Sequence, residues 1–185
     1  MRRAMIRLAM WMFILSEGIF FLLLVLAYVA YHRQQGSGPT AAGSLDLGRT
    51  AIFSACLFSS SGSMAWAARS FQRGARARFG LGLLLTLVLG GAFLTGQAVE
   101  YAGLLHQDVT ISRNLFGTTF FTLTGFHGLH VAVGLCLLLA LLGFTVVGHR
   151  TDPWPGAVEG VSLYWHFVDV VWVVIFSVVY LWAFL

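Results

Sequence analysis

Five apolar runs, each 19 residues or longer and separated by polar connections, constrain this sequence more than any other feature. They cover residues 8–31, 50–68, 79–101, 115–147 and 161–185. An α-helix needs about 20 residues to cross a bilayer core of about 30 Å. Inside hydrocarbon the backbone must satisfy its own hydrogen bonds, which a helix does within one segment. We therefore predict an all-α integral membrane bundle of five transmembrane helices, forming a single domain over residues 1–185.

The composition agrees with a membrane protein and excludes most soluble classes. Only 10% of the residues are charged and 58% are hydrophobic, whereas soluble domains carry about 25% charged residues. The net charge of +4 comes from 11 basic residues, all of them arginine. These arginines cluster between the apolar runs, as juxtamembrane residues do. A nucleic acid is therefore not expected as a partner.

The arginines also predict the orientation of the chain. Eight lie at the N-terminus, in the second connection and in the fourth connection, and three lie in the other two connections. The positive-inside rule then places the N-terminus in the cytoplasm and the C-terminus outside. The fourth run holds 33 residues, which would extend about 50 Å as a helix. It must tilt strongly or project beyond the bilayer, and Pro153 and Pro155 should end it.

Glu17 is the most unusual residue of the first run. It is the tenth residue of 24 and so lies near the expected bilayer centre, where a carboxylate costs about 2.5–3.5 kcal/mol on insertion scales. The side chain should therefore face protein. It is either a proton-linked or regulatory carboxyl, or a protonated or hydrogen-bonded group that fixes helix packing.

Polar pairs spaced three residues apart occur on three other runs. Gln97 and Glu100 share one helix face, and Glu100 is close enough to the membrane boundary for an interfacial charge to be favoured. His127 and His130 could suggest haem or copper. Two axial ligands of one haem approach from opposite sides, so neighbouring histidines on one helix cannot serve both. Packing and hydrogen bonding are favoured for this pair.

The last run begins near Glu159 and contains His166 and Asp169 on one face. Asp169 lies well inside the run and needs a partner, and His166 is the nearest candidate. Trp165 and Trp172 are either interfacial anchors or core residues. A stripe of small residues in the second run, Ser59, Ser63 and Ala67, predicts a close helix contact.

Two other function classes fit these residues. One is a free-standing membrane cytochrome in which His127 or His130 pairs with His166 as haem ligands. The other is a proton-coupled transporter that uses Glu17 and Asp169. No phosphate-binding, nucleophile or zinc motif occurs in the sequence.

Several longer strings resemble subunit III of cytochrome c oxidases. They fall in the family's order along the chain, from Trp11–Glu17 with Phe20 and Phe21, through Gly96–Tyr101, Gly117–Phe121 and Gly125–Val131, to Tyr164–Trp172. The resemblance extends over nearly the whole chain. It implies a non-catalytic subunit III of a proton-pumping haem-copper terminal oxidase, a respiratory-chain translocase that reduces oxygen to water.

The resemblance also implies partners and a location. The chain would lie beside subunit I, with subunit II and other subunits in the complex, in a bacterial plasma membrane. It would bind no haem and no copper, since these lie in the partner subunits. Its implied roles are to stabilise subunit I, to support proton uptake and to hold structural phospholipid. Cytochrome c or quinol would donate electrons to other subunits, and a related alternative is the accessory protein of nitric oxide reductases.

For individual residues, the resemblance implies that Glu17 is the family's intramembrane carboxyl. His127, His130, Glu159 and His166 match polar positions that shape the interior and the lipid-facing cleft. Longer family members have seven helices, and this chain matches the last five. Because the first two helices form one wall of the lipid cleft, lipid binding carries over only in part.

Overall fold

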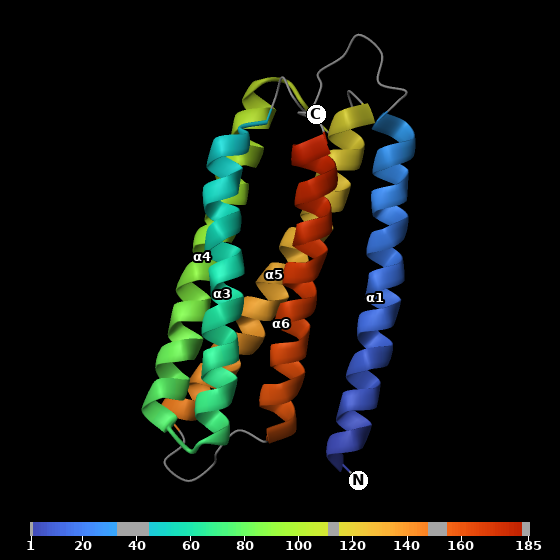
Figure 1. Ribbon diagram of the computed structural model, residues 1–185. Helices are drawn as coiled ribbons and strands as arrows, with labels where there is room; N and C mark the ends of the chain where they lie inside the picture. Colours follow the sequence, from blue (N-terminus) through green and yellow to red (C-terminus); the bar gives the residue numbers. More distant parts are fainter. Residues whose placement is uncertain (1, 33–44, 111–114, 148–154, 183–185) are drawn as a thin grey trace.

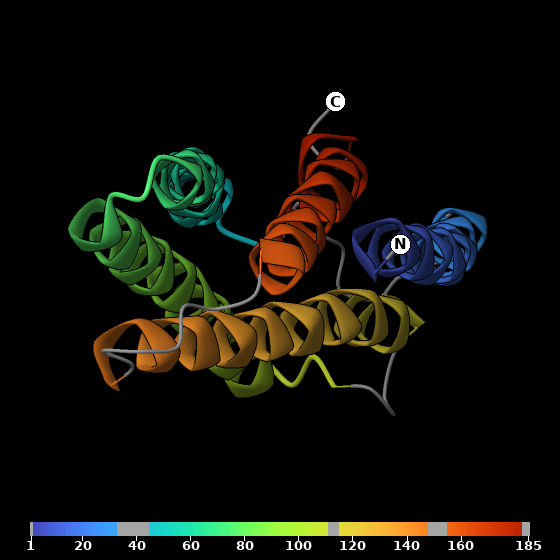
Figure 2. The same ribbon diagram turned by 90° about the horizontal axis from the view of Figure 1, so that it is seen from below.

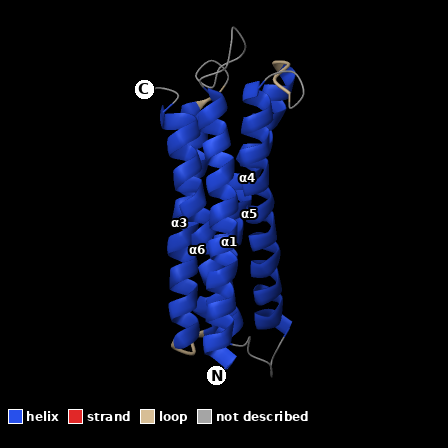
Figure 3. Cartoon of the chain, turned by 90° about the vertical axis from the view of Figure 1, so that its right-hand side faces the viewer, coloured by secondary structure: helices blue, strands red, loops and turns tan. Residues whose placement is uncertain are grey.

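A computed structural model describes residues 2–32, 45–110, 115–147 and 155–182, and these residues form a bundle of helices. The helices are α1 (Arg2–His32), α3 (Leu47–Gln72), α4 (Arg76–His106), α5 (Leu115–Val147), α6 (Pro155–Phe176) and the short π-helix η1 (Ser177–Leu181). Figures 1 and 3 show only helices and loops in the described part of the chain. Five helical stretches there are long and apolar enough to cross a membrane, as predicted.

Most helices extend beyond the apolar runs that predicted them. Only α5 has the predicted bounds, whereas α1, α3 and α4 each gain several residues at the ends. At the start of α3, the Asp46 carboxylate accepts a hydrogen bond of 3.0 Å from the backbone N–H of Arg49, which caps the helix. A capped helix can continue past the apolar residues into polar surroundings. The ends of an apolar run therefore do not mark the ends of the helix.

The fifth apolar run predicts a helix from residue 161, but α6 already begins at Pro155. Proline suits the first position of a helix, because its fixed φ is helical and its missing N–H would have no partner there. At the other end, α6 changes at Ser177 into a π-helical turn. Val179 and Tyr180 in that turn are buried.

The turn between α3 and α4 makes these helices antiparallel neighbours. Gly74 has φ +70°, a conformation that favours glycine, and its N–H donates to Phe71 O at 3.0 Å. Further along the pair, a Cβ added at Gly82 would lie 2.7 Å from the Cβ of Ala67. The two backbones can approach this closely only because both residues are small.

Helix α5 crosses the rest of the bundle. Seen along the bundle in Figure 2, it extends across the picture while α3 and α1 are viewed nearly end on. Its length predicted either a strong tilt or a projection beyond the bilayer, and the oblique course relative to α3 and α1 is consistent with the tilt. Helix α6 lies between α3 and α1, and the start of α1 and the end of η1 are at opposite ends of the bundle (Figure 1).

Trp165 of α6 is the largest side chain at the centre of the bundle, and it has no exposed surface. A Cβ added at Gly90 of α4 or at Gly134 of α5 would lie 2.7 or 2.8 Å from its ring. The indole Nε1–H donates to Ser60 Oγ of α3 at 3.0 Å. One side chain therefore contacts four helices, counting its own. Trp172 is also buried and donates to Ser54 Oγ at 2.9 Å, so both tryptophans belong to the core.

The outer surface is apolar, as the composition predicts. Trp11, Leu15 and Leu129 expose 58%, 66% and 56% of their surface, and many other large apolar residues do the same. Surfaces of this kind face lipid or other membrane-embedded proteins.

We expect Gly90→Ala to destabilise the bundle by about 1–3 kcal/mol, because the new methyl would overpack the buried Trp165 ring. Thermal unfolding of the detergent-solubilised protein measures the effect. Gly91→Ala is the matched control on the same helix, since a Cβ there meets no atom within 4 Å. Equal unfolding midpoints for the two variants would contradict the assignment of Gly90 as a slot for Trp165.

Candidate functional site

Glu17 and His130 form a contact between α1 and α5 near the middle of both helices. The Glu17 Oε2 atom lies 3.2 Å from His130 Nε2, and the two side chains expose 24% and 15% of their surface. The second ring nitrogen of His130 lies 2.7 Å from the Phe126 carbonyl oxygen. Phe21 of α1 contacts the imidazole edge-on, with ring centroids 5.0 Å apart. The carboxyl thus faces protein, as its cost in hydrocarbon requires.

His166 and Asp169 meet through a serine of α3. Ser61 Oγ lies 2.8 Å from His166 Nδ1 and donates a short hydrogen bond to Asp169 Oδ2. Asp169 is 5% exposed, and its Oδ1 atom has no hydrogen-bond partner among the described residues. The direct pairing of His166 with Asp169 that the sequence suggested is therefore replaced by a bridge through Ser61.

Ser61 belongs to a run of serines in α3 over residues 59–63. From the sequence, this run was interpreted only as a helix-packing stripe, and no hydrogen bond from Ser61 to α6 was predicted. Ser63 Oγ lies 2.8 Å from Thr86 Oγ1 of α4, and Ala67 packs against Gly82, so these two residues do form the predicted close contact. Ser59 is exposed and lies outside it. A helix turns by about 100° per residue, so Ser61 points away from Ser63 and toward α6.

His127 lies in a box of aromatic rings. Its ring stacks on Trp172 at a centroid distance of 4.8 Å and meets Phe93 and Phe21 edge-on at 5.9 and 6.4 Å. The residue is fully buried, and neither ring nitrogen has a hydrogen-bond partner in the described part of the chain. The expected packing role is present, but the expected hydrogen bonding is not.

Glu100 joins three helical elements at the end of the bundle opposite the α3–α4 turn. Its carboxylate accepts hydrogen bonds from Thr50 Oγ1 of α3 at 2.9 Å and from Tyr180 Oη of η1 at 2.7 Å. Glu100 was expected to be an interfacial charge, and in the structure two hydroxyl groups hydrogen-bond its carboxylate. The π-helical turn places Tyr180 where it reaches this carboxylate.

Gln97 connects α4 with α5 one turn away. Its amide nitrogen donates to the Thr124 carbonyl oxygen at 2.8 Å, and Tyr101 Oη lies 2.7 Å from Thr124 Oγ1. The sequence placed Gln97 and Glu100 on one face, yet their side chains contact different neighbours. Both stabilise the same end of the bundle.

At the other end, Glu159 of α6 pairs with Arg7 of α1. This ion pair is partly exposed, and such pairs contribute little stability in water. We call this end, where Arg7 and the exposed arginines of the α3–α4 turn lie, the arginine end.

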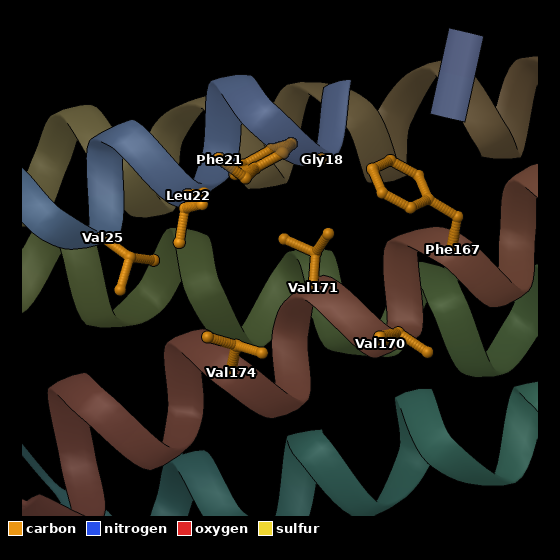
Figure 4. A pocket seen from close by; sticks show the side chains of 8 residues that line it. All are labelled: Gly18, Phe21, Leu22, Val25, Phe167, Val170, Val171 and Val174. Carbon is orange, nitrogen blue, oxygen red and sulfur yellow. The ribbon is translucent and has the colours of Figure 1, made fainter. Parts of the chain in front are cut away.

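An apolar groove of about 320 Å³ separates α1 from α6. Figure 4 shows the side chains that line it, which come from Gly18, Phe21, Leu22 and Val25 of α1 and from Phe167, Val170, Val171 and Val174 of α6. The lining offers dispersion contacts and no charge. Among the described residues, no group of three or more His, Cys, Asp or Glu side chains is arranged to hold a metal ion.

Comparison with known proteins identifies the family. The model of the family described as cytochrome c oxidase subunit III matches residues 2–184. The chain is 37% identical over 172 residues to the cytochrome c oxidase subunit 3 of Synechocystis sp., covering 92% of this chain and 72% of the relative. It is 35% identical to the subunits of the same name from Formosania lacustris and Danio rerio, covering 96% of this chain and 70% of each relative.

The chain belongs to the cytochrome c oxidase subunit III family.

Membership makes this chain a subunit III of a haem-copper oxidase, and so one part of a complex with other oxidase subunits. It is a multi-pass membrane protein. These findings favour a subunit III over a free-standing cytochrome or a transporter, since the matched region includes all five helices. The roles of Glu17, the histidines and Asp169 stay predictions.

We expect Ser61→Ala to lower the thermal stability of the oxidase by about 1–3 kcal/mol, because Asp169 and His166 would lose their shared partner in a buried site. Thermal unfolding of the purified complex measures the change. Ser59→Ala, two residues away and exposed, is the control and should have no effect. A Ser61→Ala complex as stable as the control would contradict the bridging role.

We expect Glu17→Gln to leave assembly largely intact, because an amide can still contact His130. Glu17→Leu removes that contact and should reduce the amount of subunit III in the complex. The ratio of subunit III to the other subunits after purification measures both effects. Loss of the Gln variant to the same extent as the Leu variant would show that the negative charge itself is required.

Proposed function

We propose that the chain is a non-catalytic subunit III that stabilises the haem-containing subunit I of its oxidase and supports proton uptake into it. The family match over residues 2–184 carries the proposal. The catalytic chemistry, in which oxygen is reduced to water, would then reside in the partner subunits with their haem and copper. Electrons from cytochrome c or quinol would also enter through other subunits.

The internal contacts of the described residues support a structural role. Two of the ionisable groups inside the helices have polar partners, since Glu17 contacts His130 and Asp169 contacts Ser61. His127 is enclosed by aromatic rings. Groups used in this way fix helix positions and present a defined surface to a neighbour.

Support for proton uptake comes from Glu17 and from the orientation. By the positive-inside rule, the arginine distribution favours a cytoplasmic arginine end, and we propose a bacterial plasma membrane as the location. Glu17 and His130 lie about halfway across α1 and α5. A carboxyl and an imidazole in contact can exchange a proton, so this pair is the proton-linked candidate of the chain.

The groove between α1 and α6 is the candidate site for structural phospholipid. All eight lining residues are glycine, valine, leucine or phenylalanine, which suits an acyl chain rather than a polar ligand. Phe21 and Phe167 lie at the same groove in Figure 4.

The direct test is purification through a tag on this chain, followed by mass spectrometry of the partners. A haem-copper subunit I in the preparation is the expected result. A reduced-minus-oxidised haem spectrum from the isolated chain would overturn the non-catalytic assignment.

We predict that an oxidase prepared without this chain starts at nearly the normal rate of oxygen consumption but loses activity sooner during turnover. The reason is that subunit I would lose a stabilising neighbour and its support for proton uptake. An oxygen electrode records the initial rate and the decay in one experiment. Sustained turnover at the full rate without the chain would contradict the proposed role.

A further inference from the structure

A second groove lies on a different face of the bundle, between α4 and α5 at the arginine end. It has a volume of about 560 Å³. Its lining comes from Arg76, Ala77, Gly80, Leu81 and Leu84 of α4 and from Leu142, Thr145 and Val146 of α5. It does not share a residue with the groove between α1 and α6. The lining is apolar except at the mouth, where Arg76 begins α4, and at Thr145.

The charged side chains of α3 and of the first part of α4, the helices next to the mouth, have one sign. The acidic side chain described at this end, Glu159 of α6, pairs with Arg7 of α1. Four arginines occur within ten residues, Arg69, Arg73, Arg76 and Arg78, and all four are exposed. No Asp or Glu occurs between residues 47 and 99, so α3 and the first 24 residues of α4 carry no acidic side chain. An anion near this turn would therefore meet only attractive charge from these two helices. A zwitterionic headgroup would gain less electrostatic attraction there than an anionic headgroup.

The length of the groove along α4 suits a lipid acyl chain better than a transmembrane helix. From Arg76 to Leu84 is eight residues, or about 12 Å along α4. A transmembrane helix would pack along the full bilayer core of about 30 Å. An acyl chain needs only an apolar slot that starts below the headgroup level, and this groove has that form.

Gly80 keeps the slot open at its middle. A Cβ added there would meet only Thr145 Cγ2, at an ordinary distance of 3.8 Å. The helix backbones therefore do not require glycine for close approach at this point. A larger side chain at residue 80 would instead fill the space between α4 and α5.

We propose that this groove binds an anionic phospholipid, with the phosphate at the arginines of the α3–α4 turn and one acyl chain between α4 and α5. The site goes beyond the proposed function, since it lies on another face and depends on charge. It needs no contact from subunit I.

The test uses the intact oxidase complex in lipid nanodiscs. Two photoactivatable probes with the same diazirine-bearing acyl chain are compared, one phosphatidylglycerol and one phosphatidylcholine. Mass spectrometry maps cross-links on this chain. We expect phosphatidylglycerol to label residues 76–84 and 142–146 at least about fivefold more than phosphatidylcholine, the gain that one surface arginine gives an anionic lipid.

Two variants separate the charge from the slot. Arg73→Gln combined with Arg76→Gln should reduce phosphatidylglycerol labelling to the phosphatidylcholine level, and Arg49→Gln at the opposite end is its control. Gly80→Leu should reduce labelling by both probes. Gly103→Leu is the matched control, since residue 103 is exposed near the other end of α4 and a Cβ there meets no atom within 4 Å.

Equal labelling of the wild-type groove by the two probes would overturn the proposal without any variant. So would displacement of the probe by millimolar inorganic phosphate, which would show an anion site that does not require lipid. Cross-links from the groove to another subunit, with no lipid labelling, would show that protein covers this face. None of these outcomes depends on whether the complex keeps its activity without the chain.

Discussion

The position of Trp165 between Gly90 and Gly134 is the constraint on which the rest of the bundle depends. A ring of this size fits at the centre only where two facing helices lack side chains, and Gly90 and Gly134 meet that need on α4 and α5. Its hydrogen bond to Ser60 adds α3. In a membrane, helices gain little from the hydrophobic effect when they associate, so close packing and hydrogen bonds decide their arrangement. Trp165 packs closely against α4 and α5 and donates a hydrogen bond to α3.

The polar contacts extend outward from that centre along the same helices. Trp172 and Asp169 lie within two turns of Trp165 on α6, and each contacts a serine of α3. Glu17 reaches His130 on the α5 side of the bundle. These groups are expensive in hydrocarbon unless protein surrounds them. Trp172 and Asp169 add contacts between α6 and α3, which Trp165 also joins, whereas Glu17 and His130 join α1 to α5, a pair outside the contacts described for Trp165. Contacts of this kind fix the positions of the helices relative to one another.

Much of the fold follows from the sequence because the bilayer limits the choices. Apolar runs of sufficient length predict five spans, and the 33 residues of the fourth run predict that α5 either tilts strongly or projects beyond the bilayer. The helix ends were less predictable. Asp46 caps α3 outside its apolar run, and Pro155 starts α6 inside a stretch that resembled a loop. Hydropathy indicates which residues can contact lipid, whereas capping residues determine where a helix begins or ends.

The sequence by itself determined the family, the number of spans and the need of Glu17 and Asp169 for protein surroundings, because these depend on residue type and on position within an apolar run. Only the tertiary structure decided which partners they have. Ser61 bridges His166 and Asp169, and Thr50 and Tyr180 hold Glu100, across sequence distances of up to 108 residues. Spacing on one helix shows which residues share a face. It does not show which neighbouring helix packs against that face. The packing of the helices depends on where small residues, such as Gly90 and Gly134, leave room for a large side chain such as Trp165.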